Sequence, residues 1–229
     1  MQTRPQSSPL SESFIRRARE SPRRDRIDAL LRGLDVTLSL VFFAIALVPM
    51  ALISLAIVAT SGRPALYRGK RVGRGGEFYT MLKFRTLRRG AEERLGAHLG
   101  EDLVFKTKEE RTTVGRWLRA TQLDELPQLV NVLRGDMSLV GPRPIRPIFF
   151  EQLAEDIPAY WQRLVVRPGL TGFAQVRRGY EASMAEKLAH DMEWIADRSV
   201  GLYLRTLAAT GFRVLGQSLR GAVRPTRVE

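Results

Sequence analysis

VTLSLVFFAIALVPMALISLAIVA, residues 36–59, is an unbroken uncharged stretch with Pro49 near its middle. At about 1.5 Å per residue, a helix of this length measures about 36 Å. That length is enough to cross the roughly 30 Å hydrocarbon core of a bilayer. The stretch begins too late and is too long for a signal peptide, whose apolar region has about 7 to 15 residues. We therefore expect a membrane helix that persists in the mature protein.

Basic residues flank this stretch on both sides. They are Arg23, Arg24, Arg26 and Arg32 before it, and Arg63, Arg68, Lys70, Arg71 and Arg74 after it. Loops rich in Lys and Arg prefer the cytoplasmic side, so a straight span would put one flank on the wrong side. A re-entrant helix bent at Pro49 keeps both flanks cytoplasmic, because proline cannot donate to the carbonyl of Ile45. Spanning helices also tolerate proline, so a kinked single-pass anchor stays open.

Composition divides the chain into four parts. Residues 1–26 have few large apolar side chains, and we expect them to be disordered or bound to lipid headgroups. Residues 27–62 form the expected re-entrant helix. Residues 63–220 have the size of one cytoplasmic catalytic domain, and residues 221–229 form a tail.

The formal net charge of +13 indicates a partner rich in phosphate: nucleic acid, anionic membrane lipid or a phosphorylated substrate. The apolar stretch favours the last two. The sequence contains no zinc-finger spacing, RNP-like motif or basic zipper, so we expect no nucleic acid. It has no cysteine and only two histidines, His98 and His190, which excludes disulfides and a Cys/His zinc site.

The remaining pattern predicts an α+β fold that is mostly helical. The expected elements are a short hairpin with a glycine-rich turn, helices joined by polar punctuation, a turn and strand, and amphipathic helices of which the last is interfacial. Their ranges are 65–84 for the hairpin, 113–133, 149–166 and 183–217 for the helices, and 166–176 for the turn and strand. The polar residues 100–112 are expected to form a loop.

Two segments contain residues suited to phosphate chemistry. In LDELPQL, Asp124 and Glu125 lie where a helix begins, and the helix dipole stabilises carboxylates there; a helix cap beside a solvated acid is the ordinary alternative. In GPRP, two prolines fix the backbone around Arg143, which prepares its guanidinium for bidentate contact with phosphate. Further candidate cations, each with an ordinary structural alternative, are Lys83, Arg85 and Arg119.

Three blocks occur in order: KRVGRGGEFYTMLKFRT, GRWLRATQLDELPQLVNVLRGDMSLVGPRP and VRPGLTGFAQV. Together, from about Arg32 to about Gly216, they resemble the small monotopic phosphoglycosyl transferases, also called bacterial sugar transferases. The resemblance implies a proline-broken re-entrant helix at the cytoplasmic face of the bacterial inner membrane. It also implies transfer of a sugar 1-phosphate from a UDP-sugar to polyprenyl (undecaprenyl) phosphate, with release of UMP and use of Mg²⁺.

The resemblance also implies roles for single residues. Asp124 would be the nucleophile, through a covalent phospho-sugar intermediate, and a ligand of Mg²⁺. Glu125 would support catalysis by positioning, by indirect support of the metal or by proton transfer, and these alternatives stay open. The cations expected to bind the substrate phosphates are Arg143, Arg119, Lys83 and Arg85.

The chain departs from the family pattern at three places. Lys108–Glu110 replace a common Asp-Pro-Arg, residues 177–180 replace an Asn-Gly-Arg-Asn run, and Val48 replaces the serine that often precedes the bend proline. The identity of the sugar and of the glycan, and the formation of a homodimer, therefore stay open. Two rival functions are a basic adaptor that binds anionic lipid or nucleic acid without catalysis, and a glycosyltransferase that releases nucleoside diphosphate.

Overall fold

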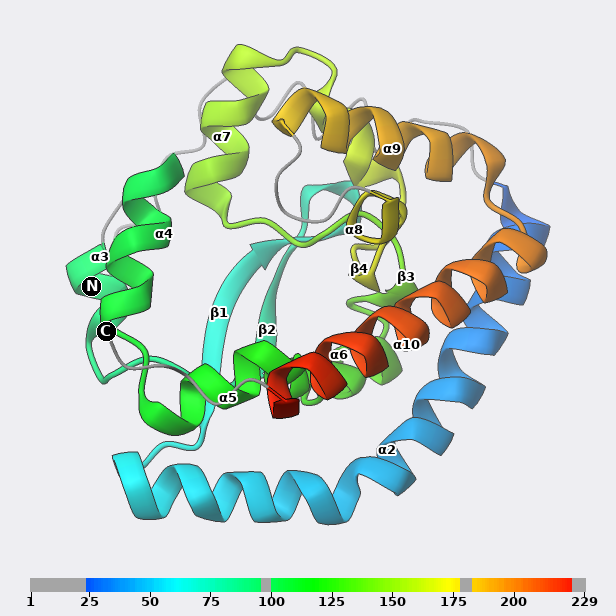
Figure 1. Ribbon diagram of the computed structural model, residues 1–229. Coiled ribbons are helices and arrows are strands. Elements are labelled where there is room, and N and C mark those ends of the chain that lie inside the picture. The colour runs from blue at the N-terminus through cyan, green and yellow to red at the C-terminus, as the bar shows by residue number, and fades with distance from the viewer. Residues whose placement is uncertain (1–23, 96–99, 178–182, 224–229) are drawn as a thin grey trace.

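One long apolar helix, α2 (Asp25–Ser61), leads into a mostly helical α+β domain with two small sheets (Figure 1). The computed structural model describes residues 24–95, 100–177 and 183–223. Most of the expected N-terminal segment and of the tail, and part of the 177–180 departure, lie outside the described residues. The predicted fold class is confirmed in its coarse form.

The predicted hairpin is present. Strands β1 (Leu66–Val72) and β2 (Phe78–Phe84) pair in antiparallel register, with Leu66 opposite Phe84. The turn holds the short helix η1 (Arg74–Gly76), where two glycines adopt positive φ, a conformation that glycine takes without steric cost. A second sheet joins β3 (Ser138–Val140) to β4 (Gly169–Thr171) in parallel.

Helices make up most of the rest. In chain order they are α3 (Ala91–Leu95), α4 (Gly100–Glu109), α5 (Thr113–Thr121), η2 (Leu123–Glu125), α6 (Gln128–Arg134), α7 (Pro147–Asp156), η3 (Tyr160–Val165), α8 (Phe173–Arg177), α9 (Met184–Asp197) and α10 (Val200–Val223). The loop predicted for residues 100–112 is wrong, because α4 occupies most of it. Its Leu, Lys and Glu residues have good helix propensity, and polar composition alone does not exclude an exposed helix. Residues 173–176, expected as strand, belong to α8.

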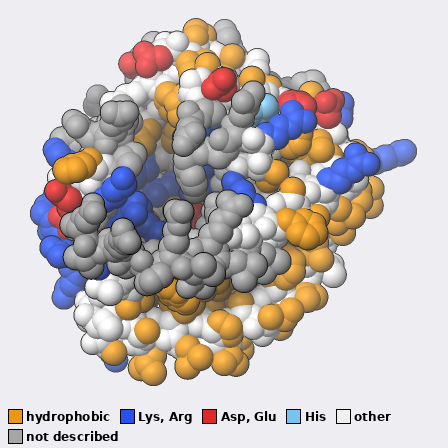
Figure 2. Space-filling model, viewed as in Figure 1, with side chains coloured by type: hydrophobic (Ala, Val, Ile, Leu, Met, Phe, Trp, Pro, Cys, Tyr) orange, Lys and Arg blue, Asp and Glu red, His pale blue; other side chains and the backbone are white. Residues whose placement is uncertain are grey.

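Helix α2 has two unlike faces. Leu31, Ala46, Ile53 and Ile57 are buried against the domain. Large apolar side chains on other faces are exposed, among them Leu40, Ile45, Val48, Leu52 and Leu55. Figure 2 shows hydrophobic side chains along the lower edge of the molecule, where Figure 1 places the second part of α2. Its length and composition suffice to cross a membrane.

Figure 1 shows α2 bent, with its two parts running in different directions around the domain. Pro49 lies inside this helix, and proline is a common cause of such a bend because it removes one backbone hydrogen bond.

Polar contacts attach the first part of α2 to the domain. The buried Asp35 Oδ1 accepts hydrogen bonds from Ser138 Oγ (2.9 Å), Leu139 N (2.8 Å) and the Tyr203 hydroxyl (2.8 Å). Arg32 donates to the carbonyl oxygens of Val132 (2.6 Å) and Leu133 (2.8 Å) near the end of α6. These contacts join α2, β3, α6 and α10 into one unit.

Candidate active site

The carboxylate pair lies in the short helix η2, between α5 and α6. Thr112 begins α5 by accepting a hydrogen bond from Gly115 N (2.9 Å). Gln122 ends α5 with φ of 58°, and it is the single residue other than glycine with positive φ in the described part of the chain. This left-handed residue redirects the backbone and places Asp124 and Glu125 side by side in η2.

Glu125 is held by two cations. Its Oε1 accepts from Lys83 Nζ at 2.6 Å and from Arg143 Nη2 at 3.1 Å. Burial raises the pKa of the Glu125 carboxyl, but the charges of Arg143 and Lys83 and their hydrogen bonds outweigh burial and lower it to about 2. Burial lowers the pKa of Lys83, and Glu125 opposes that effect. We conclude that Glu125 is ionised at neutral pH.

Asp124 has the opposite environment. Its residue is only 7% exposed, yet no described residue donates a hydrogen bond to its carboxylate. Burial raises the pKa of Asp124, whereas the positive charges of Lys83, Arg119 and Arg143 lower it and the charge of Glu125 raises it further. The carboxylate oxygens thus lie near three cations with their lone pairs available.

The GPRP segment positions Arg143 through its backbone. Gly141 and Gly169 approach so closely that a Cβ on Gly169 would lie 2.1 Å from Gly141 N, so this contact between β3 and β4 requires glycine. Behind the loop, Arg163 Nη2 donates to the Arg143 carbonyl oxygen (2.8 Å), while Arg163 Nε donates to Asp191 (2.8 Å).

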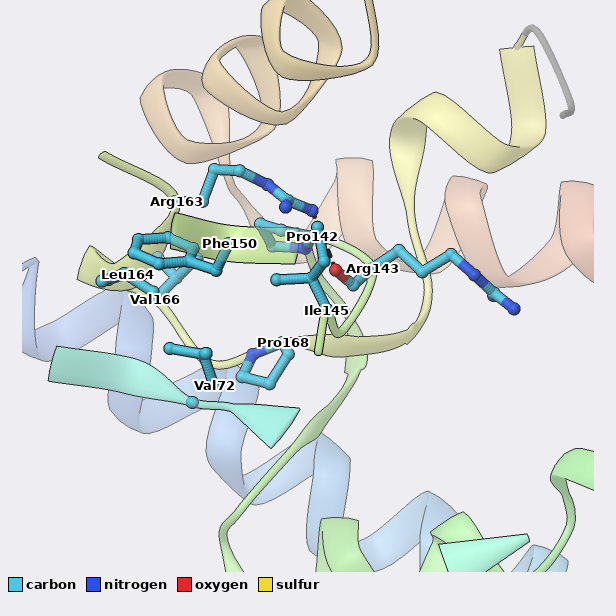
Figure 3. Close-up of a pocket in the computed structure, with 10 residues that line it drawn as sticks. Val72, Pro142, Arg143, Ile145, Phe150, Arg163, Leu164, Val166 and Pro168 are labelled. Carbon is cyan, nitrogen blue, oxygen red and sulfur yellow. Dashed lines mark hydrogen bonds between the residues drawn. The ribbon is translucent and has the colours of Figure 1, made fainter. Parts of the chain in front are cut away.

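Figure 3 shows the Arg143 side chain pointing away from the apolar pocket beside this loop, and the Arg163 guanidinium against the loop backbone. The pocket is lined by apolar side chains that include Val72, Phe150 and Leu164. The loop therefore stands between an apolar support and the charged carboxylate pair.

The sequence analysis missed Asn131, which joins β2 to α6. Asn131 Oδ1 accepts from Leu82 N (2.9 Å), and its Nδ2 donates to the Thr80 carbonyl oxygen (2.7 Å) and to Asp136 Oδ2 (3.0 Å). Asn131 is fully buried. A single amide inside the apolar run LVNVL was the available signal, because buried amides need hydrogen-bond partners. Its contacts fix the strand that carries Lys83.

The structure brings together three of the four predicted phosphate-binding cations. Lys83, Arg119 and Arg143 all act on the Asp124 carboxylate, and Arg119 Nε also donates to Thr86 Oγ1 (2.9 Å).

Arg85, the fourth predicted cation, does not join them. Its guanidinium donates to the backbone carbonyls that follow α2, those of Ser61 (2.7 Å), Gly62 (2.5 Å) and Arg63 (3.3 Å). Phosphate binding by Arg85 stays a prediction without support from this arrangement.

The donor set suits a metal that is shared with a substrate. Among the described residues, no group of three or more His, Cys, Asp or Glu side chains could hold a metal ion. Asp124 offers an uncommitted carboxylate, whereas Glu125 is already paired with two cations. Mg²⁺ is commonly bound through one or two carboxylates plus substrate phosphates. The site therefore fits Mg²⁺ brought together with a diphosphate, and does not form a complete metal cage.

Comparison with known proteins places this geometry in a family context. The model of the bacterial sugar transferase family matches residues 27–217. A UDP-glucose:undecaprenyl-phosphate glucose-1-phosphate transferase of Caulobacter vibrioides is 41% identical over 79% of this chain and 69% of its own length. A UDP-N-acetylgalactosamine-undecaprenyl-phosphate N-acetylgalactosaminephosphotransferase of Aeromonas hydrophila is 36% identical over 75% of this chain and 40% of its own.

An undecaprenyl-phosphate galactose phosphotransferase of Salmonella typhimurium is 40% identical over 64% of this chain. The match spans 32% of that protein, so this chain spans between about a third and two thirds of the length of these three relatives. Their names give three different sugars.

Proposed function

The chain belongs to the bacterial sugar transferase family, and we propose that it transfers a sugar 1-phosphate from a UDP-sugar to undecaprenyl phosphate, releasing UMP. This reaction begins the assembly of a lipid-linked polysaccharide. The observation that supports it best is the Asp124 carboxylate, which is buried, accepts no hydrogen bond from the described residues and lies among three cations. The names of the relatives support the two substrates.

In the first step, an Asp124 oxygen attacks the sugar-bearing phosphorus of the UDP-sugar. The new bond joins that oxygen to phosphorus, and the bond between this phosphorus and the bridging oxygen breaks. The bridging oxygen leaves with UMP, and Asp124 carries a covalent phospho-sugar. A carboxylate suits this role because it is ionised at neutral pH without a general base. Lys83, Arg119 and Arg143 offset the negative charge of the diphosphate.

In the second step, a phosphate oxygen of undecaprenyl phosphate attacks the same phosphorus. The bond to Asp124 breaks, the free carboxylate returns, and the product is undecaprenyl diphosphate sugar. Glu125 serves by position in this scheme: its ion pairs with Lys83 and Arg143 hold both cations beside Asp124. A carboxyl group with a pKa of about 2 is a poor proton donor near neutral pH.

We propose Mg²⁺ as the cofactor, with Asp124 as its protein ligand. A bound Mg²⁺ neutralises diphosphate charge that would otherwise repel the attacking carboxylate. The Asp124 carboxylate, which accepts no hydrogen bond from the described residues, supports this assignment.

We further propose that α2 is re-entrant and bends at Pro49, so that residues 63–220 form a cytoplasmic domain at the inner membrane. The basic flanks and the bend seen in Figure 1 support this topology. A prenyl chain keeps its phosphate at the interface, and the enzyme must meet it at that depth.

The decisive experiment measures nucleotide release. Membranes containing the protein are incubated with undecaprenyl phosphate and a panel of UDP-sugars, and UMP and UDP are separated. We expect UMP from one sugar nucleotide, loss of UMP release in Asp124→Asn, and unchanged release in Asp156→Asn, whose carboxylate lies on the exposed surface. Turnover of Asp124→Asn at the wild-type rate would exclude Asp124 as nucleophile, and release of UDP would indicate a glycosyltransferase.

The topology has its own test. Because the chain has no cysteine, single cysteines at Arg24 and at the exposed Arg68 can be labelled without background in intact cells and in lysed cells. A re-entrant helix protects both positions from an impermeant maleimide until the cells are lysed. Labelling of one position in intact cells would show a helix that spans the membrane.

A further inference from the structure

A second basic site lies away from the carboxylate pair, at the base of the apolar helix. A cavity there is lined by residues of α2, β3 and the segment before β4. Its charged lining consists of Asp28, Arg32, Asp35, Arg74, Arg167 and Arg198. None of these residues is among the charges that act on Asp124 or Glu125. The catalytic proposal therefore leaves this cluster unexplained.

The two acids of the cavity, Asp28 and Asp35, already accept hydrogen bonds from other residues. Asp28 accepts from Arg198 through both carboxylate oxygens, at 2.8 Å and 3.3 Å. Asp35 Oδ1 accepts three hydrogen bonds from β3 and α10. Neither carboxylate makes an ion pair with the cations across the cavity, Arg74 and Arg167, within the described residues.

Arg74 and Arg167 carry donors without partners in the described part of the chain. Arg167 donates through Nε to the Gly135 carbonyl oxygen (2.9 Å), which leaves its two terminal nitrogens available. Arg74 lies in the glycine-rich turn η1 and is half-buried. Burial lowers the pKa of Arg167, the charges of Arg74 and Arg32 lower it further, and the charges of Asp35 and Asp28 oppose this effect without cancelling it. Such mutual repulsion is what an anion would relieve.

The position favours a lipid as the source of that anion. Arg32 lines the cavity, and the exposed apolar surface of α2 continues from Leu40. Eight residues of helix measure about 12 Å, so the cavity lies close, along α2, to this exposed apolar surface. Leu31, Val140 and Trp194 add apolar lining to the same cavity, as a site for an amphipathic molecule requires.

We propose that this cavity binds the headgroup phosphate of an anionic phospholipid, with Arg74 and Arg167 as its principal donors. The proposal rests on the membrane association proposed above. A bound headgroup would fix the depth and rotation of α2 at the point where Asp28, Arg32 and Asp35 attach it to the domain. Guanidinium groups suit this role because they present paired donors to phosphate oxygens.

The test uses native mass spectrometry to count the lipid molecules bound to the full chain. The protein in detergent is titrated separately with phosphatidylglycerol, phosphatidylcholine and inorganic phosphate. We expect phosphatidylglycerol to bind in preference to phosphatidylcholine. Arg74→Gln should weaken phosphatidylglycerol binding about ten-fold, which corresponds to the loss of one charged contact of about 1.4 kcal/mol. Arg167→Lys, which keeps the charge and loses the paired donors, should weaken phosphatidylglycerol binding less than Arg74→Gln does. The matched control is Arg68→Gln, an exposed arginine outside the cavity.

Equal weakening by Arg68→Gln, or none by Arg74→Gln, would overturn the site. Binding of inorganic phosphate that depends on Arg74 in the absence of any preference for phosphatidylglycerol would overturn the lipid as its source. The assay requires no turnover, so Asp124→Asn should bind phosphatidylglycerol like the wild type. Loss of lipid binding with intact UMP release would refute this site alone, and the reverse result would refute the proposed reaction alone.

Discussion

Replacement of Glu125 by Gln removes the negative charge between Lys83 and Arg143 while it keeps the size of the side chain. The Glu125 side chain is 17% exposed, so solvent screens its ion pairs only in part. In the folded protein its pKa lies at about 2, against an ordinary value of 4.5. At 1.36 kcal/mol per pKa unit, this difference corresponds to about 3 kcal/mol of stability. A loss of this order also agrees with the cost of breaking a buried ion pair by removal of one partner.

The assay is urea-induced unfolding in detergent, followed by tryptophan fluorescence at pH 7. Glu125→Gln should lower the free energy of unfolding by about 3 kcal/mol, and the exposed Glu155→Gln should change it by less than about 0.5 kcal/mol. Because the folded pKa is depressed, the stabilisation by Glu125 is fully present above pH 4.5 and is lost as the pH falls toward 2. A loss below about 1 kcal/mol at pH 7, or a difference between wild type and variant that grows on acidification, would refute the ion-pair reasoning.

Two further outcomes follow from the same site. Because burial raises the pKa of Asp124 above its ordinary 3.8 and the attacking form is ionised, kcat/KM for UMP release should fall on acidification with a midpoint above that value. Arg119→Gln should move the midpoint higher still, and an unchanged or lower midpoint would contradict the electrostatic role of Arg119. Arg163→Lys cannot keep contact with Asp191, Tyr160 and the Arg143 carbonyl at once, so kcat/KM should fall about ten-fold. Arg94→Lys, in an exposed pair with Glu110, is its control, and equal losses in both variants would remove the positioning role of Arg163.

The sequence predicted the elements whose signals are local. The hairpin follows from two apolar runs around glycines, and the apolar helix follows from its length and lack of charge. The loop expected for residues 100–112 failed because composition measures solvent exposure better than backbone conformation. Helix α4 is polar along most of its length, and a polar helix resembles a loop when only composition is considered.

Contacts between distant residues were beyond the reach of local patterns. Lys83 and Glu125 are 42 positions apart, and Arg143 is 18 positions from Glu125. The local pattern of LDELPQL does not distinguish the environments of the two carboxylates, whereas the fold pairs Glu125 with two cations. Asp124 accepts no hydrogen bond from the described residues. Lys83 and Arg85 are close in sequence and were both expected to bind phosphate. Strand β2 ends at Phe84, and Arg85 beyond it donates to the backbone carbonyls that follow α2.

The hydrogen bonds that Asp35 accepts from Ser138, Leu139 and Tyr203 fix the position of the apolar helix α2 relative to the rest of the protein. Another hydrophobic segment of equal length and hydropathy would still partition into the bilayer, but it would lack the Asp35 carboxylate that fixes rotation about the helix axis. A chimera with a generic anchor should therefore remain membrane-bound while the segments that carry Asp124 and Arg143 lose their defined orientation toward the lipid surface. Exchange of anchors between such proteins must therefore preserve these hydrogen bonds as well as hydrophobicity.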